Sequence, residues 1–475
     1  MRRGASVRWC DQGRPSRLSQ GLASTCLLLA ICLAHYPGAV TASPQVGPGD
    51  WVEVKKITAP DAAAEDQFGI GLDFEGDTLV VGAPLDDDGG PNSGSVYVFE
   101  RNLGGPDNWG LVQKIRAQET QTAGDQFGVS LSLHGDMLAI GAYEDTPRPW
   151  MRSGSAYIFY RDATQPEPWY QVAKRFPDHA VNGDRYGWDV ALNDGLLLVG
   201  DPGDNGSTGA AFLYNRDTLG EDSWGLVGKL VPSDAYLVNE TGRSVAVSPH
   251  IAFIGAPSAM AGSNRKGAVY VYLPQDSSDP EPWCEALKLI ASDGEVADYF
   301  GVSVSLSGDT IAIGAPKEDP GQWYSGAVYV FERGPGGWAD WQQVAKLKAP
   351  QPGDMDFLGW DVAIDGDRIL AGAPLRENAA YDDAGAAFVF ERDAYAPGHW
   401  ICTAELTASD GAHGDALGDF VALEGRHAFM SARQDDDAGN RSGSVYYFAR
   451  PPDPEPLFAD GFESGDTSAW SQTVP

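Results

Sequence analysis

Two Trp–Asp pairs are the residues of this sequence best suited to contact a ligand. Trp188 precedes Asp189, and Trp360 precedes Asp361. An aromatic ring beside a carboxylate can bind a sugar or an amine. Two carboxyl groups that face one cavity can also divide the acid and base work of glycoside cleavage. The alternative interpretation is structural, namely packing between repeated units that tolerates either residue type.

Two runs of aspartates are candidate ligands for a cation, and Ca²⁺ prefers such oxygen ligands. The alternative is an acidic loop in contact with solvent. No other cofactor is indicated by the sequence. The six residues of the two runs are Asp86, Asp87, Asp88, Asp435, Asp436 and Asp437.

Motifs of the common enzyme classes are missing from the sequence. It contains no His-Glu-x-x-His, Gly-x-Ser-x-Gly or P-loop pattern. Its histidines share no spacing that suits a metal. The sequence therefore favours binding over catalysis and names no catalytic residue.

A pattern repeated seven times supplies the elements that must position these residues. Each copy opens on a tryptophan and continues with an aromatic–Gly pair, a Gly-Ala-Pro-like triplet, and a run of alternating hydrophobic residues. A fixed period of this kind indicates units that bury their faces against one another. The tryptophans are Trp51, Trp109, Trp169, Trp224, Trp283, Trp341 and Trp400.

Each copy divides into four strand-like runs bounded by turn residues. In the first copy they are Val52–Ile57, Gly69–Phe74, Thr78–Ala83 and Ser95–Phe99. Seven such units predict an all-β fold, a seven-bladed β-propeller with four antiparallel strands per blade. A linear solenoid is the structural alternative. Because a Trp-led run precedes the first aromatic–Gly pair and none follows the last, the N-terminal strand is expected to complete the last blade and close the ring.

The two glycine motifs resemble the FG-GAP repeats of integrin α-subunit propellers and their exported bacterial relatives, and the resemblance covers all seven copies. It implies a propeller that binds its ligands on one face. Clear copies are Phe68-Gly69, Phe300-Gly301, Gly82-Ala83-Pro84 and Gly314-Ala315-Pro316, and degenerate ones include Gly200-Asp201-Pro202 and Ser431-Ala432-Arg433.

The chain departs from the family where calcium is concerned. In the family, several repeats carry an Asp-x-Asp-x-Asp-Gly-like calcium loop between the two motifs. Here that slot holds a tight turn such as Glu75-Gly76-Asp77, which offers too few oxygens for Ca²⁺. The family's calcium sites are therefore not expected in this chain.

A recurring aspartate stands two residues before the aromatic–Gly pair. In a blade, the loop between the second and third strands and the loop into the next blade emerge on one face. The aspartate runs and the recurring aspartates are thus expected to share that face, where turn formation explains the recurring ones. They are Asp66, Asp125, Asp184, Asp298, Asp356 and Asp415.

The chain divides into three parts. Residues 1–42 have a basic start, an apolar run too short to span a membrane, and small residues before a cleavage point, as export signals do. Residues 51–449 form the propeller, and residues 450–475 form a Pro-rich linker and a short tail. The net charge of −34 disfavours nucleic acid as a partner.

Together these features predict a secreted or cell-surface protein, with no transmembrane segment once the signal is cleaved. Its expected role is a non-catalytic binding or adhesion scaffold that recognises protein or glycan with its acidic loop face. The alternative is a propeller enzyme, a glycan hydrolase or lyase, with Asp189 and Asp361 near the central channel. A purely structural part of a surface layer is a third possibility.

Overall fold

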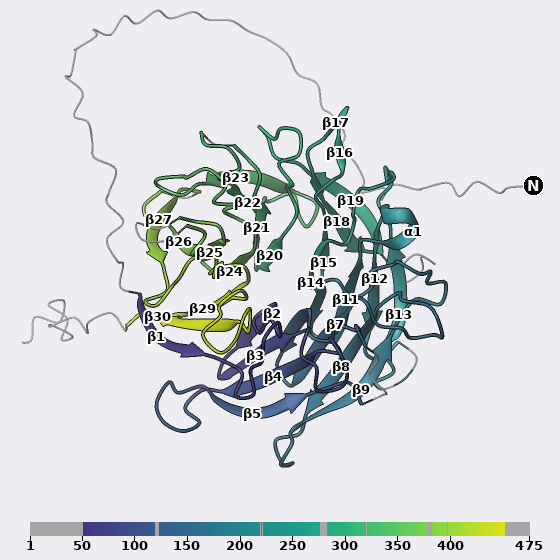
Figure 1. The fold of residues 1–475 in the computed structure, drawn as a ribbon. Coiled ribbons are helices and arrows are strands. Elements are labelled where there is room, and N and C mark those ends of the chain that lie inside the picture. Colours follow the sequence, from purple (N-terminus) through teal and green to yellow (C-terminus); the bar gives the residue numbers. More distant parts are fainter. Residues whose placement is uncertain are drawn as a thin grey trace, which may run out of the picture.

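The computed structural model describes residues 51–118, 123–218, 220, 222–275, 283–319, 321–377, 382–396 and 398–451. The expected export signal and the tail after residue 451 lie outside these residues. Within them, the chain forms seven four-stranded antiparallel sheets arranged around a ring (Figure 1). The predicted seven-bladed β-propeller is therefore confirmed.

The blades are numbered in chain order, and their strands run from the ring centre outward. Blade 1 consists of β2 (Gly71–Glu75), β3 (Thr78–Ala83), β4 (Ser95–Glu100) and β5 (Gly110–Ile115). Blade 2 consists of β6 (Ser130–His134), β7 (Met137–Ala142), β8 (Ser155–Arg161) and β9 (Trp169–Arg175). Blade 3 consists of β10 (Val190–Asn193), β11 (Leu196–Asp201), β12 (Ala210–Asn215) and β13 (Gly225–Leu230).

Blades 4 to 6 follow the same order. Blade 4 consists of β14 (Ser244–Ser248), β15 (Ile251–Ala256), β18 (Ala268–Pro274) and β19 (Trp283–Leu289). Blade 5 consists of β20 (Val304–Ser307), β21 (Thr310–Ala315), β22 (Ala327–Arg333) and β23 (Trp341–Leu347). Blade 6 consists of β24 (Val362–Asp365), β25 (Arg368–Ala373), β26 (Ala386–Arg392) and β27 (Trp400–Leu406).

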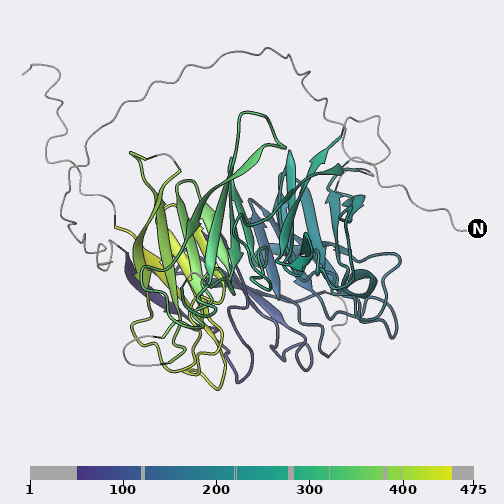
Figure 2. The ribbon, with the colours of Figure 1, turned by 90° about the horizontal axis from the view of Figure 1, so that it is seen from above.

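Blade 7 joins the two ends of the described chain. It consists of β28 (Val421–Glu424), β29 (His427–Ala432), β30 (Ser444–Ala449) and, outermost, β1 (Val52–Ile57). The β1 strand pairs antiparallel with β30, from Val52 opposite Ala449 to Ile57 opposite Val445. Figure 2 shows this purple first strand beside the yellow last strands. The predicted closure by the N-terminal strand is thus correct, and it gives blade 7 four strands like the other six blades.

The two glycine motifs hold neighbouring blades together by direct backbone contact. A Cβ atom added to Gly82 in blade 1 would lie 1.9 Å from the carbonyl oxygen of Gly128 in blade 2. Gly128 itself has φ +96°, a conformation that favours glycine. No side chain fits between these backbones, so the repeated glycines follow from the spacing of the blades.

The hydrophobic core lies between adjacent sheets. One buried cluster combines Val328 of blade 5 with Ile369 and Phe388 of blade 6, and Trp400 at the start of β27 packs against them. The motif aromatics belong to these cores, since the Phe300 ring meets the Tyr329 ring edge-on at 5.4 Å between centroids. Each blade therefore needs its neighbours to bury its faces.

Two sets of loops share one end of the strands, and we call this end the loop face. The first set joins the second and third strands of each blade, and the second set leads from each outermost strand into the next blade. Backbone bridges link the two sets, for example Gly154 to Tyr186 and Gly326 to Leu358. The predicted common face for both sets is thus correct.

Two small elements decorate the loop face. The one-turn helix α1 (Asp204–Ser207) lies in the β11–β12 loop, and the short hairpin of β16 (Met260–Ala261) and β17 (Asn264–Arg265) lies in the β15–β18 loop. In the part of the chain that the structure describes, no helix is long and apolar enough to cross a membrane.

Candidate functional site

The innermost strands of all seven blades surround a central cavity of about 750 Å³. All four residues of the predicted ligand site, Trp188, Asp189, Trp360 and Asp361, line this cavity. They come from the entries of blades 3 and 6. The structure thus brings together residues that lie far apart in the sequence, while their role in ligand binding stays a prediction.

The two aspartates of this set bridge neighbouring blades. Asp189 accepts hydrogen bonds from the N–H groups of Val190, at 2.9 Å, and of Val245 in blade 4, at 2.7 Å. Asp361 likewise accepts one from Val421 in blade 7, at 2.9 Å. Innermost strands of adjacent blades are not paired to each other, so these carboxylates satisfy backbone donors that would otherwise lack partners. This contact supports the structural interpretation of both residues.

Asp73 of β2 performs the same bridging role, although sequence reasoning did not single it out. Its carboxylate accepts a hydrogen bond from the Leu133 N–H of blade 2 at 2.7 Å. Ser132 and Ser305 bond the following blade in the same way. These residues stand four positions after the motif glycine, whereas Asp189 and Asp361 stand two after it. Because side chains two apart share a strand face, aligning the repeats at both positions would have revealed Asp73.

Burial alters the acidity of these carboxyl groups. It raises the pKa of Asp189 to about 6 and the pKa values of Asp73 and Asp361 to about 7. The hydrogen bonds from backbone N–H groups oppose this shift, and the Asp189 charge adds to it at Asp361. The cavity wall therefore carries groups that exchange protons near neutral pH.

The two tryptophans have different surroundings. The Trp188 ring lies under two guanidinium groups, with Arg243 at 4.7 Å and Arg185 at 5.3 Å from the ring centroid. The Tyr143 ring packs beside it at 4.7 Å. Trp360 instead meets the edge of the Phe357 ring at 6.2 Å. Trp188 is thus part of a cationic cluster, and Trp360 belongs to an aromatic one.

The residues directly after the motif glycines differ among the blades, and those of blades 1 to 6 line the central cavity. Blades 1, 2 and 5 have an aliphatic residue there, whereas the other blades have tryptophan or a charged residue. Asp419 of blade 7 forms an ion pair with Arg433. This ring of positions is therefore chemically uneven. In chain order its residues are Ile70, Val129, Trp188, Arg243, Val302, Trp360 and Asp419.

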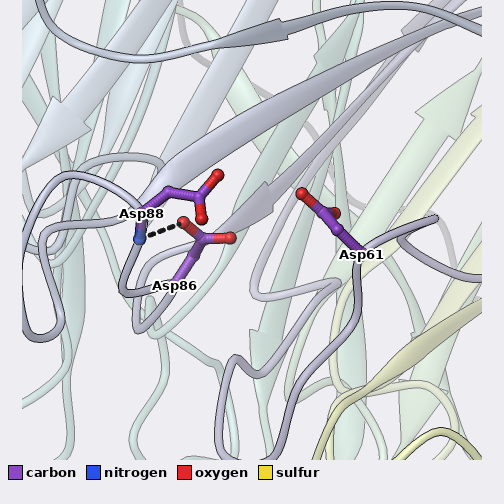
Figure 3. A group of neighbouring side chains, drawn as sticks. All are labelled: Asp61, Asp86 and Asp88. Atoms are coloured by element: carbon purple, nitrogen blue, oxygen red, sulfur yellow. Dashed lines mark hydrogen bonds between the residues drawn. The ribbon is translucent and has the colours of Figure 1, made fainter.

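The first aspartate run surrounds a lysine. Lys114 on β5 places its Nζ 2.7 Å from Asp86 and Asp88, and 2.8 Å from Asp61. Figure 3 shows these three carboxylates, with Asp61 reaching across from a separate segment and the Asp88 N–H bonded to Asp86. Asp87 lies outside this group, and its carboxylate accepts a hydrogen bond from the Asn92 N–H.

Charge pairing sets the protonation of this group. Burial raises the pKa of Asp86, but hydrogen bonds from Lys114, the Asp88 N–H and Ser95 leave it below its usual range. Burial lowers the pKa of Lys114, yet its bonds to the three carboxylates raise it overall. The pairing therefore favours the charged forms of Asp86 and Lys114, and the ammonium lies among the carboxylates, where a metal ion would have to bind.

The second aspartate run repeats this arrangement at the closure of the ring. Lys56 of β1 contacts Asp435 and Asp437 at 2.6 Å and Asp410 at 3.0 Å, while Asp436 is exposed. The prediction of metal binding at Asp86–Asp88 and Asp435–Asp437 stays a prediction, and the structure supplies a lysine as the cation in both places.

The recurring aspartates close turns, as the sequence interpretation held. In five of them, the aspartate carboxylate accepts a hydrogen bond from the backbone N–H three residues before it. The observed pairs are Asp66 with Ala63, Asp184 with Val181, Asp298 with Glu295, Asp356 with Gly353, and Asp415 with Ala412.

The seven blades correspond to a known repeat family. The family model described as FG-GAP repeat matches residues 51–99, 109–159, 169–214, 224–272, 283–331, 341–390 and 400–448. The chain therefore belongs to the FG-GAP repeat family, and its fold is that of an integrin α-like propeller. A comparison with curated proteins finds no match. FG-GAP propellers are typically binding domains of extracellular or cell-surface proteins.

Proposed function

We propose that this protein is an exported, non-catalytic scaffold for binding or adhesion, and that it recognises protein or glycan with its loop face. The chain's membership of the FG-GAP family supports a binding role in general. Residues 1–42 support export by their composition alone. N-terminal sequencing of secreted material tests that part, since cleavage near residue 42 is expected and retention of the leader would contradict it.

The observation that carries the proposal is a row of aromatic rings from the loop face to the cavity. Trp323 is about half exposed and stacks on Tyr324 at 4.3 Å between centroids. Tyr324 lies 6.0 Å from Phe357, which contacts Trp360 at 6.2 Å. Such a row offers flat apolar surface to sugar rings or to apolar side chains.

Exposed apolar side chains distinguish the two faces of the ring. A partner that covers such side chains removes apolar surface from water, which favours binding. In the described loops, the opposite face carries Leu103 and Tyr395. The loop face carries Trp150, Val181, Val231, Tyr236, Leu237, Val238, Ile290, Val296, Trp323 and Met355.

Binding of the labelled full chain to glycan and protein arrays tests this proposal. Trp323→Ala removes the exposed end of the aromatic row and is expected to weaken binding at least tenfold, as loss of a central aromatic contact does. Tyr395→Ala is the matched control, because Tyr395 is 97% exposed on the opposite face. Equal losses in both variants, or none in either, would contradict recognition by the loop face.

A glycan hydrolase or lyase is the second candidate. The observation in its favour is that Asp189 and Asp361 line one cavity and have pKa values raised to about 6 and 7. Release of reducing ends from a panel of polysaccharides tests it. Activity that disappears in both Asp189→Asn and Asp361→Asn would establish the enzyme, whereas an inactive wild-type chain that still binds glycans supports the scaffold.

A further inference from the structure

Blade 3 breaks the second glycine motif at a fully buried position. Its triplet is Gly200-Asp201-Pro202, and the Asp201 side chain is 0% exposed. The other six blades have alanine at this position, at the end of the second strand counted from the ring centre. Those alanines are Ala83, Ala142, Ala256, Ala315, Ala373 and Ala432.

Two further carboxylates surround Asp201. Asp184 comes from the loop before β10, and Asp204 from the loop after β11. Oxygen atoms of the three residues lie within 4.8 Å of one another. Asp184 is 4% exposed, whereas Asp204 is partly open to solvent. The group therefore has a closed side formed by two residues and an open side at the third.

Two oxygens of the group have no hydrogen-bond partner among the described residues. Asp201 Oδ1 accepts the Arg185 N–H at 3.0 Å, and Asp184 Oδ2 accepts the Val181 N–H at 2.7 Å. Their other oxygens, Asp201 Oδ2 and Asp184 Oδ1, are buried and accept no such bond. Native proteins rarely leave buried carboxylate oxygens in this condition.

A glycine permits the close approach of the two loops. A Cβ atom on Gly203 would lie 2.6 Å from the carbonyl oxygen of Gly183 and 2.9 Å from the Arg185 nitrogen. In blade 1 the corresponding residue is Leu85. The backbone of blade 3 is thus shaped to bring the two loops, and with them the three carboxylates, together.

The local lysine does not neutralise the group. Lys229 Nζ contacts Asp204 at 2.7 Å, and this is the ion pair that the described residues provide to the three aspartates. Burial, followed by the nearby Asp184 charge, raises the pKa of Asp201 to about 8. Burial likewise raises the pKa of Asp184. Metal binding requires ionised carboxylates. With all three ionised, the one ammonium leaves two negative charges without a counterion.

We propose that Asp184, Asp201 and Asp204 bind a divalent cation that prefers oxygen ligands, and that this cation is Ca²⁺. Each residue supplies one carboxylate oxygen, and water completes the coordination from the open side at Asp204. A doubly charged ion balances the two unpaired negative charges. The site lies on the loop face, at the other end of the strands from the hairpin turns where the family carries its calcium loops.

Calorimetric titration of the metal-free full chain with CaCl₂ tests the site, together with thermal melts in CaCl₂ and in chelator. The wild type is expected to bind one equivalent of Ca²⁺ with a Kd that excess Mg²⁺ weakens little. At a calcium concentration 100-fold above that Kd, the melting midpoint is expected to rise by roughly 3 °C.

Asp201→Ala is the informative variant, because it restores the residue that the other blades have. It is expected to keep the fold and to melt no lower than the wild type in chelator, while its calcium affinity falls at least tenfold. The double variant Asp86→Asn, Asp88→Asn in blade 1 is the matched control and is expected to keep the wild-type calcium response.

Three results would overturn the proposal. The first is a wild-type chain that shows neither binding heat nor a midpoint shift in CaCl₂. The second is an Asp201→Ala variant with undiminished affinity. The third is a calcium response that disappears in the blade 1 control instead. None of these results bears on the aromatic row, so the proposed binding function can stand or fall separately.

Discussion

Blades 1 and 3 each bring three carboxylates to the same corner of the loop face, and the two groups are neutralised differently. In blade 1, Lys114 contacts Asp61, Asp86 and Asp88, and the Tyr97 hydroxyl bonds Asp61 and Asp86. In blade 3, Phe212 stands in the place of Tyr97 and has no hydroxyl, Asp201 replaces an alanine, and Lys229 reaches Asp204. The comparison teaches that the number of acidic residues alone does not define a cation site.

The remaining blades show that the internal cation is a general feature of this ring. In five blades a lysine on the outermost strand faces a tyrosine on its neighbour and lies about 5 Å over its ring. Blade 6 reverses the charges, because Arg376 from the loop pairs with Glu405 on the outermost strand at 3.1 Å. The lysine–tyrosine pairs are Lys56–Tyr446, Lys114–Tyr97, Lys174–Tyr157, Lys288–Tyr270 and Lys346–Tyr329.

The largest expected effect comes from removing the internal cation of blade 1. Lys114→Met leaves Asp86 buried without its counterion and is expected to lower the free energy of unfolding by about 3 kcal/mol. Lys229→Met is the matched variant in blade 3. It is expected to lose about 1 kcal/mol or less, because Lys229 is more exposed and has one carboxylate partner.

Denaturant unfolding in chelator measures both changes. Calcium sharpens the comparison, since the three carboxylates that Lys114→Met leaves free should acquire a calcium response that the wild-type blade 1 lacks. Equal losses of stability in the two variants would remove the distinction between the blades.

A second prediction concerns pH. The unfolded chain releases the Asp201 proton near pH 4, whereas the native chain retains it up to about pH 8. The native state thus binds more protons in this window, so stability falls as pH rises, by up to about 1.4 kcal/mol per pH unit from this group. Asp201→Asn in chelator is expected to flatten the fall between pH 5.5 and 8.

The difference between wild type and variant is the quantity to measure, because Asp73, Asp189, Asp361 and Asp419 also have raised pKa values. Asp184, Asp204 and Lys229 are the charged groups around Asp201, and all remain in the variant. Saturating CaCl₂ should reduce the wild-type slope as well. Parallel pH profiles for the two chains would show that Asp201 is ionised throughout.

The smallest expected effect tests the reversed pair of blade 6. Glu405→Lys places an ammonium beside Arg376 and is expected to lower the free energy of unfolding by about 1 kcal/mol. Adding Arg376→Asp recreates the lysine–aspartate pair of blade 1 and should recover part of that loss, because the buried Asp356 also loses its ion pair with Arg376. A double-mutant cycle measures the coupling, and additive effects of the two substitutions would mean that the pair contributes no interaction energy.

Much of the fold could be predicted from the sequence, and particular residues show why. Trp51 and Val52–Ile57 precede the first aromatic–Gly pair, which places the closing strand in blade 7 by counting alone. The strand bounds shift slightly, since β2 begins at Gly71 and not at Gly69. Gly69 instead follows the loop into the blade, where its N–H bonds the Gly82 carbonyl.

The candidate sites could be predicted less completely. Asp189 and Asp361 stand out in the sequence because they break the repeat, yet their carboxylates accept hydrogen bonds from backbone N–H groups of the next blade. The aspartate runs are conspicuous in the sequence, yet the structure pairs them with Lys114 and Lys56. Asp201 was visible as a departure from Gly-Ala-Pro, but its meaning depends on Asp184 and Asp204, which the sequence does not place beside it.

The sequence by itself determined the number of blades, the order of their strands and the closure of the ring. Each of these follows from a pattern that every copy carries locally. Only the tertiary structure decided which charges meet. Lys56 and Asp410 become neighbours across 354 positions of the chain, because the ring brings its first strand back to its last blade. The charge state of a carboxylate depends on distance through space and on burial, and no local pattern encodes either.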